Sequence, residues 1–199
     1  MRRETQKRII SLSLKYKGYI STPELLKEGV TNRQIKEFTD QGILEKVSRG
    51  HYWFQCAGYK KPREYKALEV CMTDSEAVIC ADSACFYWGL LEKEPEILSI
   101  ATRRTDRKKI EMNFPIARHY YSEKSFKASY KQVYTEFGSY SISDIDRSVC
   151  DCIRFSDHIG EENLKIIVEA YQNRKDKMLE RLIMYAEALR VHQKVKQYL

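Results

Sequence analysis

The chain has 199 residues, of which 43% are hydrophobic and 32% are charged, and its formal net charge is +7. This length and composition favour one or two packed domains and exclude a chain that is disordered throughout. No apolar run approaches the roughly 18 residues of a transmembrane helix. The N-terminal residues MRRETQKR have no apolar segment behind their charges, so we expect no secretory signal, no membrane partner and a cytoplasmic location.

The cysteines and histidines do not have the spacing of a metal site. None of the cysteines forms a C-x-x-C pair, and the histidines lie far apart in the sequence. We therefore expect reduced thiols and neither a metal nor any other cofactor. The six cysteines are Cys56, Cys71, Cys80, Cys85, Cys150 and Cys152.

The positive charge is confined to one part of the chain. Residues 1–61 carry 13 lysines and arginines against 6 acids, whereas residues 62–199 carry 22 against 22. The whole surplus of +7 therefore lies in the first third. This asymmetry predicts a basic domain, 1–61, that binds a polyanion, and a neutral domain, 62–199, with another role.

The first third has the pattern of three helices. Residues 2–16 have helical spacing of apolar side chains and precede Gly18. A short helix follows and stops at Gly29: either Thr22 caps it with Pro23 at the first helical position, or Ser21 and Glu24 form a capping box. The turn at 28–31 contains this glycine, as helix-turn-helix motifs do.

A third helix and a hairpin follow. Thr31 and Gln34 form another capping box, and the helix they begin stops at Gly42. The strand-like runs 43–47 and 52–54 surround a turn that contains Gly50. Three helices followed by a hairpin predict a winged helix-turn-helix.

This order of elements suits double-stranded DNA. The third helix would enter the major groove, where Arg33 can bind a guanine edge and Asn32 or Gln34 an adenine edge. Arg49, beside Gly50, suits the adjacent minor groove. Arg2, Arg3, Lys7 and Arg8 suit backbone phosphates. The candidate DNA-binding residues are Thr31, Asn32, Arg33, Gln34, Lys36, Lys46, Ser48, Arg49 and His51.

Two observations leave a protein-contact role open for this domain. Winged helices also bind proteins, and basic residues on an outward helix face are common. Glu37 and Asp40, further along the third helix, would oppose phosphate contacts there. The positive surplus nevertheless favours DNA.

The rest of the sequence, residues 62–199, predicts a mixed α/β domain that ends in a helical bundle. Residues 55–74 form a connection, with its seam at 60–62 and a short helix at 64–70. Residues 75–88 are apolar nearly all round and predict a central buried helix. Strands are expected at 97–101, 110–116 and 133–142, the last with a turn at Gly138-Ser139, and a basic loop is expected at 103–109. Helices follow from Ser143 to the end, so the fold class is α+β.

Catalytic motifs are absent from the sequence. It contains no phosphate-binding loop, no dinucleotide-binding glycine turn and no nucleophile elbow. Asp146 and Asp151 fall near one helical face, and paired carboxylates serve metal-dependent nucleases. We favour a structural interpretation, in which Asp151 pairs with Arg147 or Arg154. The chain is therefore expected not to be an enzyme.

Three segments, taken in order, carry a family resemblance. They are residues 20–25 (ISTPEL) with 42–52 (GILEKVSRGHY), residues 81–90 (ADSACFYWGL) and residues 143–154, which contain DRSVCDC. The chain resembles AbiEi-type antitoxins of bacterial abortive-infection toxin–antitoxin systems, whose second and third motifs read S-A-x-x-x-x-G-L and E-R-T-L-V-D-C. Asp146, Ser148 and Cys150 depart from the third motif, which bears only on helix packing.

The resemblance implies two roles for the chain. The winged helix would bind inverted repeats in its own promoter and repress its operon. The C-terminal domain would neutralise a nucleotidyltransferase-like toxin without forming a stable complex with it, in the manner called type IV. The alternative is a solitary winged-helix regulator whose second domain senses a ligand or partner, and a third class is a DNA-acting enzyme that uses Asp146 and Asp151.

Overall fold

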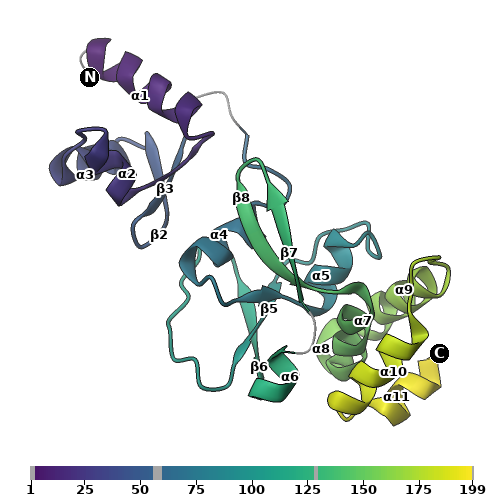
Figure 1. Ribbon diagram of the computed structural model, residues 1–199. Coiled ribbons are helices and arrows are strands. Elements are labelled where there is room, and N and C mark those ends of the chain that lie inside the picture. Colours follow the sequence, from purple (N-terminus) through teal and green to yellow (C-terminus); the bar gives the residue numbers. More distant parts are fainter. Residues whose placement is uncertain (1–2, 56–59, 128–129, 199) are drawn as a thin grey trace. The chain divides into compact units, whose positions relative to one another are not determined.

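The computed structural model describes residues 3–55, 60–127 and 130–198. The chain divides into two compact units, and Figure 1 shows their helices and strands. The first comprises residues 1–74, 110–113 and 134–139, and the second comprises 75–109, 114–133 and 140–199. Across the described ranges, no helix is long and apolar enough to cross a bilayer. The structure combines helices with one antiparallel sheet and one mixed sheet, which agrees with the expected α+β class.

Three helices and a small sheet make up most of the first unit. The helices are α1 (Arg3–Lys15), α2 (Thr22–Lys27) and α3 (Asn32–Asp40), and the strands are β1 (Tyr19–Ser21), β2 (Leu44–Ser48) and β3 (His51–Phe54). The sheet has the order β1-β3-β2 and both of its pairings are antiparallel. The capping box at Thr31 and Gln34 is confirmed for α3, and of the two starts expected for α2 the structure has the Ser21–Glu24 box rather than a Thr22 cap.

The first unit has its own apolar core. Side chains from α1, α2, α3 and the sheet meet in one cluster, which includes Leu12, Leu25, Ile35 and Phe54. The turn after α1 depends on Gly18, whose φ is +92°. A Cβ at this position would lie 2.3 Å from the Trp53 ring, so only glycine fits between the helix and β3.

The predicted domain boundary at residue 61 lies inside the first unit. Helix α4 (Tyr65–Thr73) confirms the short helix expected in the connection, and this helix belongs to the first unit. Lys61 Nζ lies 2.7 Å from both Glu45 Oε1 and Glu69 Oε1, and the Tyr19 hydroxyl donates to Glu69 at 3.0 Å. These contacts attach residues 61–69 to the sheet of the first unit, so the segment around 60–62 is not a free linker.

A mixed five-stranded sheet organises the second unit. Its order is β6-β5-β4-β8-β7, with β4 (Val78–Ile79), β5 (Leu98–Arg103), β6 (Ile116–Tyr121), β7 (Tyr130–Thr135) and β8 (Gly138–Ser143). β5 pairs parallel with β6 and antiparallel with β4, and β4 pairs parallel with β8. The first two residues of β8 and the last two of β7 fall in the first unit.

Three expectations for this sheet are wrong. Val78 and Ile79 form a central strand rather than part of the helix expected over 75–88, because a short buried apolar run suits either structure. The strand expected at 110–116 begins instead at Ile116, after Pro115, which can donate no ladder hydrogen bond. The turn of the last hairpin lies at 136–137, so Gly138 begins β8.

Helices cover the second unit and fill its C-terminal end, as Figure 1 shows in green and yellow. Helices α5 (Ala81–Tyr87) and α7 (Ile145–Arg154) share one apolar core with the last helices. α7 is capped by Asp144, so the helix begins two residues after Ser143, the residue at which helices were expected to start. The remaining helices are α6 (Glu123–Lys127), α8 (Ser156–Ile159), α9 (Glu161–Gln172), α10 (Leu179–Ala188) and α11 (His192–Tyr198).

His119 of β6 packs its ring against this helical layer. The ring stacks on Phe155, with centroids 4.0 Å apart, and burial together with His158 and Arg154 lowers its pKa from 6.5 to about 4. Because the unfolded chain binds this proton more tightly, we expect the free energy of unfolding to fall as the pH drops from about 6.5 to 4. The loss should be on the order of 1–2 kcal/mol, since solvent screens the partly exposed ring.

Chemical denaturation of the intact chain across this pH range measures that loss. His119→Phe keeps an aromatic ring on Phe155 and lacks the titrating nitrogen. The difference between the two proteins in how the free energy of unfolding changes with pH reports on His119, because their carboxyl groups contribute equally. Equal slopes in the two proteins would contradict the assignment.

Candidate nucleic-acid interface

The N-terminus of α3 is held by side chains that come from the helix itself. The Thr31 backbone N–H donates to Gln34 Oε1 at 2.9 Å, and the Gln34 N–H donates to Thr31 Oγ1 at 3.3 Å. Ile35 and Phe38 enter the core, which sets the rotation of the helix about its axis. The capping box therefore fixes where the helix begins, and the burial of Ile35 and Phe38 fixes which side chains of the first turn face outward.

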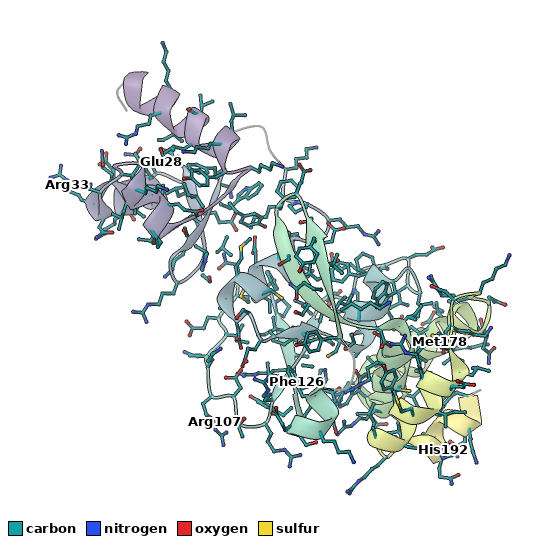
Figure 2. The ribbon with its side chains drawn as sticks, viewed as in Figure 1. Glu28, Arg33, Arg107, Phe126, Met178 and His192 are labelled. Carbon is teal, nitrogen blue, oxygen red and sulfur yellow. The ribbon has the colours of Figure 1, made fainter. Side chains whose placement is uncertain are left out.

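Three basic or amide side chains of α3 point away from the core. Asn32, Arg33 and Lys36 are exposed, and Figure 2 shows Arg33 extending outward from the helix. Glu37 and Asp40 are also exposed, one turn and more beyond Arg33. The amide and guanidinium groups are thus at the start of the helix, where its dipole also attracts phosphate, and the acids follow.

Gln34 is placed differently from its neighbours. It is half-buried, and its amide oxygen accepts from both the backbone N–H and the hydroxyl of Thr31. A bidentate contact to adenine needs that oxygen as an acceptor, so Gln34 would have to leave the capping box to make one. Asn32 is the better candidate for such a contact.

The turn between α2 and α3 is tied to α1. Glu28 Oε1 accepts from Tyr16 at 3.0 Å and pairs with Lys15 Nζ at 2.5 Å. The hydrogen bond to Lys15 lowers the pKa of Glu28, and the same bond raises that of Lys15. Figure 2 labels Glu28 in this turn. The contact joins the turn between α2 and α3 to the end of α1.

The β2–β3 hairpin presents one arginine at its tip. Arg49 is exposed and precedes Gly50, whose φ of +81° suits a tight turn. The Gly50 carbonyl accepts from the Thr22 N–H at 2.8 Å, which anchors the turn at the start of α2. Lys46, on β2, is exposed as well.

Two of the predicted residues on the hairpin lie further inside. Ser48 is 6% exposed, and its hydroxyl lies 3.4 Å from Nδ1 of His51, which is half-buried. Ser48 therefore has little surface to offer a ligand, and we leave it out of the proposed contacts. In that position it can set the orientation of the His51 ring.

The basic residues of α1 are only partly described. Arg2 and the side chain of Arg3 lie outside what the structure describes. Lys7 and Arg8 are exposed, and the Arg8 guanidinium lies against the α2–α3 turn, 2.9 Å from where a Cβ on Gly29 would be. Sequence patterns did not reveal this contact or the one between Tyr16 and Glu28, because both join segments more than ten residues apart.

The acids considered for catalysis lie inside a buried network on α7. Asp151 accepts from the Tyr121 hydroxyl at 2.8 Å and pairs with Arg147 Nε at 3.1 Å, which confirms the expected ion pair. The Asp146 carboxylate accepts from Tyr171 at 2.8 Å and from the Met178 N–H at 3.0 Å. Burial raises the pKa of Asp151, and the Arg147 guanidinium opposes that rise.

This network has the character of a structural centre. Asp146 and Asp151 are 1% and 0% exposed, and their carboxylates are occupied by partners from β6, α9 and the segment before α10. Among the described residues, no cluster of three histidines, cysteines or acids has metal-binding geometry. The described cysteines are free thiols, and Cys56 lies outside the described residues.

Comparisons with known proteins bear on the fold alone. No protein-family model matches the chain, and no curated protein matches it. Among solved structures, the chain is similar to the crystal structure of the RV2827C protein from Mycobacterium tuberculosis, with a TM-score of 0.58 and 11% sequence identity. The similarity covers 97% of this chain and 80% of that one, so the fold has a precedent in an experimental structure.

Proposed function

We propose that the chain is a DNA-binding antitoxin that represses its own operon and has no catalytic role. In this proposal α1, α2, α3 and the β2–β3 hairpin form a winged helix-turn-helix. The observation that carries the DNA-binding part is the exposed start of α3, with Asn32, Arg33 and Lys36, in the region that holds the whole positive surplus. A capped helix that presents such groups has the chemistry of a major-groove reader.

The proposed contacts divide by role. Arg33 and Asn32 read base edges, Lys36 and Lys46 bind phosphates, and Arg49 enters the adjacent minor groove. Thr31 and Gln34 hold the helix start, and His51 supports the hairpin turn. The bond from Glu28 to Tyr16 keeps α3 at a fixed angle to α1. A recognition helix that is already rigid loses little conformational entropy when it binds DNA.

The antitoxin part rests on the resemblance to AbiEi-type antitoxins. Two of the resembling segments form α5 and α7, and they meet in one core, where Cys85 Sγ lies 3.6 Å from Cys152 Sγ. These two segments therefore belong to one structural unit. The partner in this proposal is a nucleotidyltransferase-like toxin, neutralised without a stable complex.

A paired assay in cells tests both roles. A reporter placed behind the promoter of the chain's own gene measures repression, and growth in the presence of the toxin encoded beside that gene measures protection. We expect the wild-type chain to repress and to protect. Arg33→Ala/Arg49→Ala should lose repression and retain protection, because the second unit is unchanged.

The control and the contradicting results separate the candidate functions. Lys93→Ala/Lys165→Ala removes two exposed cations from the second unit and should leave repression unchanged. Failure of the wild-type chain to repress would refute the DNA-binding role. Repression without protection would favour the solitary regulator. The enzyme alternative is not proposed, because Asp146 and Asp151 are engaged in the buried network.

A further inference from the structure

A pocket in the second unit lies beside the carboxyl ends of two parallel strands. Its volume is about 430 Å³, and its lining includes Arg104, directly after β5, and Tyr120, near the end of β6. The two strands run parallel from Leu98 and Ile116 onward. Ligands in α/β folds bind outside the carboxyl ends of parallel strands, where the loops leave a crevice.

The pocket is lined by four cations and one acid. The cations are Arg104, Lys124, Arg154 and Arg190, and the acid is Glu187. Within the described part of the chain, none of the four forms an ion pair, and Arg154 instead lies over the Tyr121 ring, 5.1 Å from its centroid. Like charges around one concave site repel each other, and a bound anion relieves that repulsion.

Nearby arginines of the same unit behave differently. Arg103 pairs with Glu76 at 2.7 Å, and Arg118 pairs with Asp106 at 2.8 Å. Arg103 and Arg118 are therefore each paired with an acid, whereas the four cations of the pocket form no ion pair among the described residues.

Other groups in the pocket suit a phosphate with an organic part. Ser122 and Ser125 supply hydroxyls, which lie 3.0 Å apart. Tyr120 is 47% exposed, and the Arg118 guanidinium lies 5.1 Å from the centroid of its ring. An exposed ring beside a cationic cluster can stack a base while the cations bind phosphates. The volume is in the range of small-ligand sites.

Two features act against an anion here. Glu187 lines the pocket, and Arg154 and Ala188 stand at the C-terminal ends of α7 and α10, which carry partial negative charge. The four cations outnumber these contributions. We propose that the pocket binds a nucleotide, with its phosphates on Arg104, Lys124, Arg154 and Arg190 and its base against Tyr120. This inference does not depend on the proposed DNA-binding role.

Competition binding with the intact chain tests this proposal. Fluorescently labelled ATP, in the presence of a chelator, is the probe, and unlabelled ATP, inorganic triphosphate, adenosine and a short duplex are the competitors. We expect saturable binding that ATP and triphosphate displace and adenosine does not. ATP should compete at least about fivefold better than triphosphate, and Tyr120→Leu should abolish that advantage.

Charge-neutral variants locate the site. Arg104→Gln/Lys124→Gln should weaken ATP binding at least about tenfold, because two charge-assisted contacts are lost. Lys93→Gln/Lys165→Gln, which removes the same charge from exposed positions of the same unit, should change it less than about twofold. Equal effects of the two variants, or no saturable binding, would overturn the proposal. So would displacement by the duplex alone, since the pocket would then be part of a nucleic-acid surface.

Discussion

Replacing Arg33 with alanine should weaken binding of the chain to the repeats of its own promoter by about 1–3 kcal/mol, or roughly 5- to 150-fold. Arg33 is exposed on the first turn of α3, and the burial of Ile35 and Phe38 fixes the direction in which it points. A bidentate contact from a guanidinium to guanine contributes specificity as well as affinity. The loss should therefore be larger on the promoter repeats than on a scrambled duplex, as measured by fluorescence anisotropy at fixed salt.

Arg107 provides the matched control for this measurement. It is an exposed arginine on the loop after β5, in the second unit, and Figure 2 shows it there. Arg107→Ala removes the same charge and should change affinity by less than about twofold. If both variants lose the same affinity, net charge rather than a reading helix determines binding.

Replacing Arg147 with leucine should lower the free energy of unfolding by about 3–5 kcal/mol. The substitution leaves the Asp151 carboxylate fully buried with the Tyr121 hydroxyl as its remaining side-chain partner. It also removes the bond from Arg147 Nη1 to the Ser125 carbonyl, at 2.9 Å, which joins α7 to α6. Chemical denaturation and thermal unfolding of the intact chain measure the loss.

The chain contains a matched pair at the same spacing on the exposed face of a helix. Lys165 and Glu169 of α9 are also separated by four residues, with 3.9 Å between Nζ and Oε1. Lys165→Leu should change stability by less than about 0.5 kcal/mol, because both side chains are in solvent. The double variant Arg147→Leu/Asp151→Leu should be less destabilised than the sum of the two single variants. Additive losses would show that the two residues do not act as a pair.

Local signals explain what could be predicted from the sequence. The capping boxes at Ser21–Glu24 and Thr31–Gln34 involve residues three apart, so the starts of α2 and α3 were found correctly. The hairpin around Gly50 was also found, because its two strands and its turn are neighbours in the sequence. These elements carry most of the candidate DNA-binding residues, whose function stays a prediction.

The remaining features depend on partners distant in the sequence. Val78 and Ile79 form a strand because β5 and β8 flank them, which the apolar run alone does not reveal. The Asp146 carboxylate accepts a hydrogen bond from Tyr171, and the Asp151 carboxylate accepts one from Tyr121. Each tyrosine lies at least 25 residues from its partner in the sequence. The cationic pocket combines β5, β6, α6, α7 and the end of α10, so no single stretch of sequence indicates it.

The salt dependence of promoter binding is the most direct test of the central claim, that the positively charged first third of the chain recognises DNA. Titration of the intact chain on a duplex with the promoter repeats, and on a scrambled duplex, gives both affinity and salt slope. We predict tighter binding to the repeats at every salt concentration, with affinity falling steeply as salt rises. Equal affinity for the two duplexes, or binding that does not change with salt, would contradict the account.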